Sequence, residues 1–441
     1  MRRVQAALVC LLLAATANAE PPPTAMELVA PALLSSPLHT VRPELTLIGP
    51  MANFEIDTRF GELEAPSVEL LAIRVEELNA LEKIAAVSRT EMYRTAATAA
   101  GSRTARAVGT VVSNPVETAR GLPEGIRRLF SRRADSVKRR ARDLSDKATD
   151  AARDRPDYAG QSATDAEDKP PERSTGERAE RAASSFALDY VGYNKARRES
   201  ARLLEIDPYT SNPILNAKLD DLAWATLAGG FTFGKALGLA TGGAGPILSR
   251  VVRANDIVWE KSPEDVRAFN EERLRKLRLS GPEARKFLRN GSFSPTLQTA
   301  LVDALAGIGP AIGRTDVLDF AGSAQNELEA RFVLRALQML LAETGRGFKT
   351  YSIAPTANAL LITGWDGSTL LPLPVDYLTG SDEIKSWFRD QLQAPAGTRV
   401  LIAGWVAADA KALLESMHLR VESSVSYPDR PSYASQSPSA P

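Results

Sequence analysis

The stretch Ile206–Val251 decides how this chain is organised, and it reads IDPYTSNPILNAKLDDLAWATLAGGFTFGKALGLATGGAGPILSRV. Glycines recur in it at every fourth residue, at Gly230, Gly234, Gly238 and Gly242. Residues four apart share one face of a helix, so these glycines would line a groove that admits the backbone of a neighbouring helix. The pattern predicts close helix packing, and it identifies no chemical reaction.

Three interpretations of residues 222–251 are open. Residues 222–240 carry a single charge, Lys235, so they are long and apolar enough for a transmembrane helix. They also suit a helix buried in a soluble bundle, either continuous over 213–241 or broken at the glycines. A phosphate-binding loop at 242–245 is disfavoured, because no strand precedes it and no Lys-Ser/Thr pair follows. We favour the buried helix, since Lys235 lies mid-span and polar helices flank the stretch.

Helix-start signals surround this stretch on both sides. An apolar helical pattern begins at Phe186, and Asp207-Pro208 ends it. Further signals, in which a capping residue precedes a proline or an apolar run, recur at Ser262-Pro263, Ser280-Gly281-Pro282, Ser294-Pro295 and Ser323. Residues 186–345 therefore read as a helical bundle.

The period changes from helical to strand-like at Gly345, and residues 346–427 read as a small α/β module. Asp366-Gly367 is a hairpin signal between two of its strands, and residues 428–441 form a polar tail that we expect to be disordered. The strands of the α/β module are expected at 348–353, 359–363, 369–373, 399–403 and 419–426, and its helices at 381–388 and 407–417. The predicted fold class is therefore mainly α, with a small C-terminal α/β module.

The first 19 residues are predicted to be a signal peptide. Arg2 and Arg3 precede a short apolar run, and Ala17-Asn18-Ala19 is an A-x-A cleavage site, so cleavage is expected after Ala19. The apolar run is too short to span a bilayer. We therefore expect an exported protein, either periplasmic or secreted.

Residues 20–46 are rich in proline and read as an extended arm, while 47–144 read as a strand pair followed by helices. Ser67 is a capping signal for a helix that continues toward Ala100. Carboxylates lie beside the apolar stripe of this helix, at Glu69, Glu76, Glu77 and Glu82. We interpret them as its solvated face rather than as catalytic acids.

Residues 120–142 predict a basic amphipathic helix. Such a helix can lie on an anionic membrane surface or cover an acidic partner, and it can equally be a packing helix with a solvated basic side. Its basic face comprises Arg127, Arg128, Arg132, Arg133, Lys138, Arg139 and Arg140. Residues 145–185 follow without Val, Ile, Leu, Met, Phe or Trp, so they read as a disordered linker.

Composition narrows the chemistry that is available. The chain has 54 basic and 54 acidic residues, which gives no support for nucleic acid as a partner. Its one cysteine, Cys10, lies in the signal peptide, and its two histidines are His39 and His418. Metal sites built from Cys or His are therefore not expected, and neither is a cofactor. The weak catalytic candidates are Asp366, Asp376 and His418.

These patterns predict a function only in outline. The leading hypothesis is an exported, bacterial-type envelope protein without catalytic activity, which binds or scaffolds an unknown envelope protein or contacts an anionic membrane surface. The alternative is a periplasmic or secreted hydrolase with its site in the C-terminal α/β module. A hydrolase would need convergent polar groups in a pocket of that module.

Overall fold

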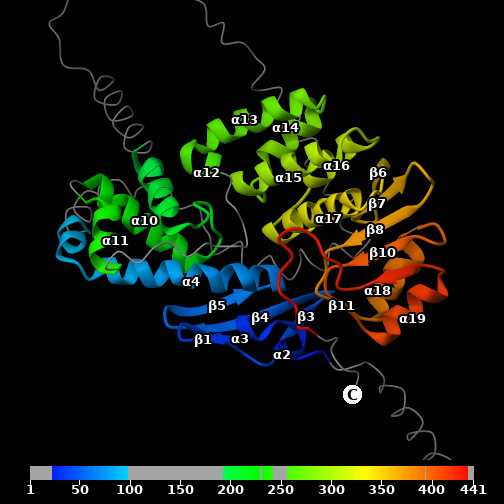
Figure 1. The fold of residues 1–441 in the computed structure, drawn as a ribbon, viewed down its shortest axis with the longest axis horizontal. Helices are drawn as coiled ribbons and strands as arrows, with labels where there is room; N and C mark the ends of the chain where they lie inside the picture. Colours follow the sequence, from blue (N-terminus) through cyan, green and yellow to red (C-terminus); the bar gives the residue numbers. More distant parts are fainter. Residues whose placement is uncertain (1–21, 98–191, 229–230, 242–255, 393, 436–441) are drawn as a thin grey trace, which may run out of the picture.

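The computed structural model describes residues 22–97, 192–228, 231–241, 256–392 and 394–435 (Figure 1). This part of the chain is mainly helical, as expected, but its strand content is notable because a second sheet lies near the N-terminus. None of the helices in these ranges is long and apolar enough to cross a membrane. The predicted signal peptide, the basic segment 120–142 and the linker 145–185 lie outside the described residues.

The N-terminal sheet is antiparallel and packs against one long helix, α4 (Val68–Ser88) (Figure 1). Inward-facing side chains alternate along β4, so Phe54 and Ile56 are buried. Ser67 caps α4 as predicted, because its hydroxyl accepts a hydrogen bond from the backbone N of Leu70 at 3.0 Å. The strands are β1 (Ser35–Ser36), β2 (His39–Val41), β3 (Thr46–Ile48), β4 (Met51–Thr58) and β5 (Gly61–Ala65), in the order β1-β2-β4-β3 with β5 also paired to β4.

The interpretation of residues 20–46 as an extended arm is wrong for the residues that the structure describes there. They form two short helices, α2 (Ala25–Leu28) and α3 (Pro31–Leu34), before β1 and β2. Ala25, Leu28 and Val29 are fully buried. Their apolar side chains join the core beneath the N-terminal sheet, and this contact is long-range, so no local pattern revealed it.

The expected disorder of the C-terminal tail is also wrong for residues 428–435. Tyr433 is buried and forms an antiparallel bridge with Val29. The backbone N of Ala30 donates to the carbonyl of Ser432 at 3.1 Å, and that of Ala434 donates to the carbonyl of Leu28 at 3.0 Å. The two segments that read as unstructured therefore pair with each other.

The glycine-containing stretch does not form one continuous helix. It contains α10 (Pro213–Ala228) and α11 (Phe233–Thr241), with a non-helical break before Phe233. A methyl group on Gly234 would lie 3.3 Å from Leu203, whereas one on Gly238 would meet nothing within 4 Å. Gly230 and Gly242 are outside the described ranges. Glycine disfavours a helix interior by about 1 kcal/mol, which is consistent with a break at this point.

The bundle continues as expected from capping signals, with two helices that the sequence did not reveal. Ser262 and Ser294 cap α13 and α15, and their hydroxyls accept from the backbone N atoms of Asp265 and Leu297. Asn326, rather than Ser323, caps the last helix. The helices are α12 (Asp256–Glu260), α13 (Pro263–Lys276), α14 (Pro282–Arg289), α15 (Pro295–Ile308), α16 (Arg314–Ala321) and α17 (Glu327–Gly345), of which α12 and α16 were not predicted.

The C-terminal module is a mixed sheet in the order β12-β10-β8-β7-β6, flanked by helices (Figure 1). Its strands β6, β7 and β8 are antiparallel, whereas β8, β10 and β12 are parallel. A separate pair, β9 and β11, follows the ends of β8 and β10. The elements are β6 (Thr350–Thr356), β7 (Ala359–Gly364), β8 (Thr369–Leu373), β9 (Tyr377–Leu378), α18 (Asp382–Ser386), a π-helical turn (Trp387–Gln391), β10 (Arg399–Ile402), β11 (Trp405–Val406), α19 (Ala408–Ser416) and β12 (Arg420–Glu422).

The N-terminal sheet docks on the C-terminal module at the end of β8. The carbonyl of Pro50, in the β3–β4 turn, accepts from the backbone N of Asp376 at 3.1 Å and from that of Tyr377 at 3.0 Å. Open α/β sheets usually bind ligands beyond the carboxyl ends of their parallel strands. Here the chain's own β3–β4 turn lies against that end of β8.

Candidate ligand-binding cavity

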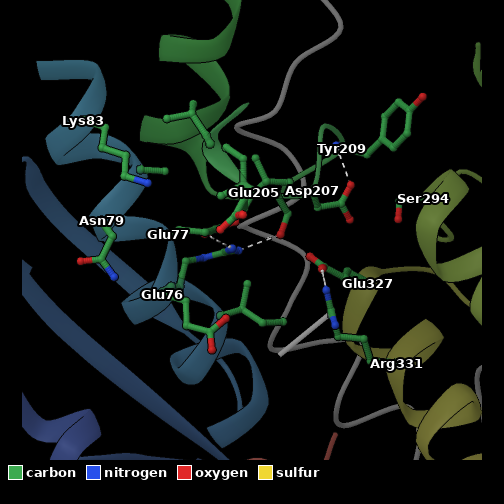
Figure 2. Close-up of a pocket in the computed structure, with 17 residues that line it drawn as sticks. Glu76, Glu77, Asn79, Lys83, Glu205, Asp207, Tyr209, Ser294, Glu327 and Arg331 are labelled. Atoms are coloured by element: carbon green, nitrogen blue, oxygen red, sulfur yellow. Dashed lines mark hydrogen bonds and ion pairs between the residues drawn. The ribbon is translucent and has the colours of Figure 1, made fainter. Parts of the chain in front are cut away.

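A cavity of about 160 Å³ lies between α4, the turn 205–211 and the start of α17 (Figure 2). A site for one water molecule needs only about 10–15 Å³, so this cavity holds several waters or a small solute. Five carboxylates and three cations line it. The charged side chains are Arg74, Glu76, Glu77 and Lys83 from α4, Glu205 and Asp207 from the turn, and Glu327 and Arg331 from α17.

The turn 205–211 brings its polar side chains toward α4 because of how the preceding helix ends. The helix over 192–204 stops at Glu205, which has a left-handed backbone with φ of 59°, and Ile206 N donates to the carbonyl of Ala201 at 3.0 Å. Glycine or asparagine is usual at such a helix end, so glutamate there is uncommon. Asn212 then caps α10 by accepting from the backbone N of Leu215 at 3.2 Å.

The α4 side of the cavity holds a buried ion pair, in which Nε of Arg74 has no hydrogen-bond partner. Arg74 donates to Glu77 at 3.1 Å and to the hydroxyl of Ser211 at 2.7 Å. Glu77 also accepts from Asn212 at 3.0 Å and from the hydroxyl of Thr210. Glu77 is 5% exposed, so its interpretation as part of a solvated face is wrong. It ties α4 to the turn.

The α17 side holds a second group of buried ion pairs. Arg331 contacts Glu327 at 2.7 Å and Glu69 at 2.6 Å, and Arg335 contacts Glu69 at 2.8 Å. Burial alone would raise the pKa of Glu69, but Arg335 and Arg331 outweigh burial and lower it to about 2. Glu69 is 8% exposed, so it too is not on a solvated face. Glu82, by contrast, is exposed as expected.

Two carboxylates from the turn, those of Asp207 and Glu205, form no ion pair among the described residues. Asp207 accepts from the backbone N of Tyr209 at 2.8 Å and from the hydroxyl of Thr296 at 2.9 Å, and no ion pair joins it to a cation within the described ranges. Burial raises the pKa of Asp207 to about 6. The Oε2 atom of Glu205 is buried and has no hydrogen-bond partner. The cavity thus presents a buried acceptor atom, Oε2 of Glu205, that the protein itself leaves unsatisfied.

The structure does not bring the three sequence-derived catalytic candidates together. Asp366 is exposed in the β7–β8 turn, where hydrogen bonds from Ser368 hold its pKa below the ordinary value. Asp376 follows the opposite end of β8 and is 2% exposed. His418 is exposed at the left-handed end of α19. The pocket that Asp376 lines includes neither Asp366 nor His418.

The proposed basic contact face from Arg127 to Arg140 lies outside the described part of the chain, so membrane or partner contact there stays a prediction. Sequence reasoning missed Glu205 and Asp207, because Asp207-Pro208 reads simply as a helix stop. A glutamate at a helix end that favours glycine was the one local signal that could have drawn attention to them.

Comparison with known proteins assigns this cavity no role. No protein-family model matches the chain, and neither does any curated protein or solved structure. Its function is therefore inferred from its own residues.

Proposed function

We propose that this chain is an exported, non-catalytic binding protein that holds a small cationic molecule, such as an amine or a guanidinium compound, in the cavity between α4 and α17. The observation that carries the proposal is the buried Oε2 atom of Glu205, which lines the cavity without a hydrogen-bond partner. A buried polar atom left without a partner costs about 1–3 kcal/mol. An N–H group of a bound cation would satisfy it.

The charges around the cavity favour a cation over an anion. Arg74 and Arg331 are both already paired with carboxylates, and an anionic ligand that took over either pair would break a buried interaction. Nε of Arg74 has no hydrogen-bond partner and Lys83 also lines the cavity, but five carboxylates outnumber the three cations. No ion pair joins Glu205 or Asp207 to a cation among the described residues, and the nearby Arg331 lowers the pKa of Asp207 less than burial raises it. A cation next to Asp207 would also favour its ionised form and lower its pKa.

Ligand binding is expected to be measurable with simple amines. Isothermal titration of the purified protein with putrescine, agmatine or methylguanidinium should give saturable binding with at least one of them. Hydrogen bonds to a charged group contribute about 1.5–3 kcal/mol, so Glu205→Gln should weaken that affinity about 10- to 100-fold. Glu82→Gln, an exposed substitution on α4 away from the cavity, is the matched control and should leave the affinity unchanged.

Two results would count against the cavity as a cation site. The first is the absence of saturable binding for all three amines. The second is equal weakening by Glu205→Gln and Glu82→Gln, because a general loss of negative charge would then explain the effect. Preferential binding of acetate or phosphate would likewise overturn the proposal.

Export is tested separately. If residues 1–19 are removed as the A-x-A pattern predicts, N-terminal sequencing of the protein recovered from an expressing bacterium should begin at Glu20. A retained Met1, or lipid on Cys10, would contradict cleavage after Ala19.

A further inference from the structure

The carboxyl group of Asp376 lies where three distant segments of the chain meet. One oxygen accepts from the backbone N of Ala52 in β4 at 3.1 Å and from that of Val68, the first residue of α4, at 3.2 Å. The other accepts from the hydroxyl of Tyr433 in the C-terminal segment at 2.9 Å. A single side chain therefore joins the N-terminal sheet, α4 and the end of the chain to the α/β module.

The three hydrogen bonds to Asp376 favour its ionised form, because Asp376 is the acceptor in each of them. Burial opposes them and outweighs them, since Asp376 is 2% exposed and no cation pairs with it among the described residues. Ionisation adds a second buried negative charge beside that of Glu69, and burial disfavours it. The charged and titratable groups facing this position are Glu69 from α4, Arg331 and Arg335 from α17, and Tyr427, Arg430 and Tyr433 from the C-terminal segment.

Those neighbours do not cancel the added charge. Arg331 and Arg335 are both engaged with Glu69, and Arg430 lies over the ring of Tyr433 at 4.6 Å while donating to the carbonyl of Ala403. None of these cations forms an ion pair with Asp376 among the described residues. The junction is thus better suited to a neutral carboxyl group than to an ionised one.

We propose that protonation of Asp376 controls how tightly the N-terminal sheet and the C-terminal segment dock on the α/β module, with the junction closed in mild acid and loosened at and above neutral pH. Protonation of Asp376 would act through local opening of the N-terminal sheet and the C-terminal segment rather than through unfolding of the helical bundle. It is independent of whether the cavity binds a cation.

The direction follows from linkage. Burial raises the pKa of Asp376 from its ordinary value of 3.8 to about 7, so the folded junction holds a proton that the opened junction releases. The resulting stabilisation is complete below pH 3.8 and is lost as the pH rises to about 7. Glu69 has the opposite sign, because its lowered pKa removes stability only as the pH falls from 4.5 toward 2. Between pH 5 and 8, Asp376 is therefore the group to follow at this junction.

Hydrogen exchange of the full-length chain between pH 5 and 8 tests the proposal. After correction for the intrinsic exchange rate, protection of peptides covering 51–54, 67–71 and 428–435 should fall by about tenfold per pH unit up to about pH 7 and then level off. A peptide from α16, which does not contact Asp376, should change much less. Protection at the junction that is constant over this range, or that falls equally in α16, would overturn the proposal.

Variants assign the effect to one carboxyl group. Asp376→Asn should give pH-independent protection at the junction, whereas Asp366→Asn, at the exposed turn, should keep the wild-type slope. An unchanged slope in Asp376→Asn would refute the assignment. If Asp376→Asn does not fold, the carboxyl carbon of Asp376 in the wild-type protein can be titrated by NMR, and a midpoint below pH 5 would refute it equally.

Discussion

Arg331→Met is expected to lower the free energy of unfolding by about 3–5 kcal/mol, the range for breaking a buried ion pair by removing one partner. Arg331 is buried and contacts Glu69 at 2.6 Å and Glu327 at 2.7 Å. Methionine retains much of the apolar stem, so most of the loss comes from the carboxylates that remain. Arg335 still contacts Glu69 at 2.8 Å, which keeps the loss within this range rather than above it.

Urea unfolding followed by circular dichroism measures the change, and the chain offers a matched control. Arg275 forms an ion pair with Glu272 at 2.8 Å, but its side chain is 68% exposed. Exposed pairs contribute about 0–1 kcal/mol, so Arg275→Met should change stability very little. A loss below about 1 kcal/mol for Arg331→Met would show that the group of ion pairs does not hold α4 against α17.

Gly404→Ala is expected to destabilise the protein by about 3 kcal/mol or more, at the upper end of overpacking costs. A methyl group there would lie 1.9 Å from the carbonyl oxygen of Asp376 and 2.6 Å from its carbonyl carbon. These are backbone atoms, and Gly404 N also donates to the carbonyl of Val375 at 2.9 Å. The clash therefore cannot be relieved by rotating a side chain.

The control for this substitution is Gly238→Ala in α11. No atom lies within 4 Å of the added methyl group, so the change in helix propensity alone should apply, a gain of about 1 kcal/mol. Thermal unfolding of the two variants should move in opposite directions. A Gly404→Ala protein as stable as the wild type would mean that β8 and β10 can separate at their ends without loss.

The features that could be predicted are those that depend only on residues close together in the sequence. The caps at Ser67, Ser262 and Ser294 lie where expected. Each serine hydroxyl accepts a hydrogen bond from the backbone N three residues later, so the cap needs no partner that is distant in the sequence. The β7–β8 hairpin follows from Asp366-Gly367 for the same reason. Periodicity likewise located the strands of the α/β module to within a few residues.

Features that depend on distant partners could not be predicted. Glu69 lies beside an apolar stripe, which usually marks a solvated position, yet its partner Arg331 is 262 residues away in the chain. The proline-rich N-terminal segment and the polar C-terminal tail each lack a pattern, and they become ordered by pairing with one another at Val29 and Tyr433. Burial and charge pairing override local composition in each of these places.

The residues of the candidate site also separate into those that a local pattern indicated and those that depend on distant partners. Asp376 was singled out because it follows a predicted strand, but its partners Ala52, Val68 and Tyr433 identify a junction rather than a catalytic pair with Asp366. Glu205 and Asp207 line the cavity only because the turn 205–211 meets α4 and α17. Cavities between elements distant in sequence are not visible in any local motif.

The pairing of Val29 with Tyr433 also constrains the order in which the chain can be completed. During synthesis the first strands emerge long before Asp376, Tyr433 and Ala434, which supply part of their final contacts. Contacts this distant in sequence form late, because a long loop must close first. A nascent chain therefore carries an unfinished N-terminal sheet until residues 432–434 are made. If the chain is exported as proposed above, it meets a translocation channel before that sheet is complete.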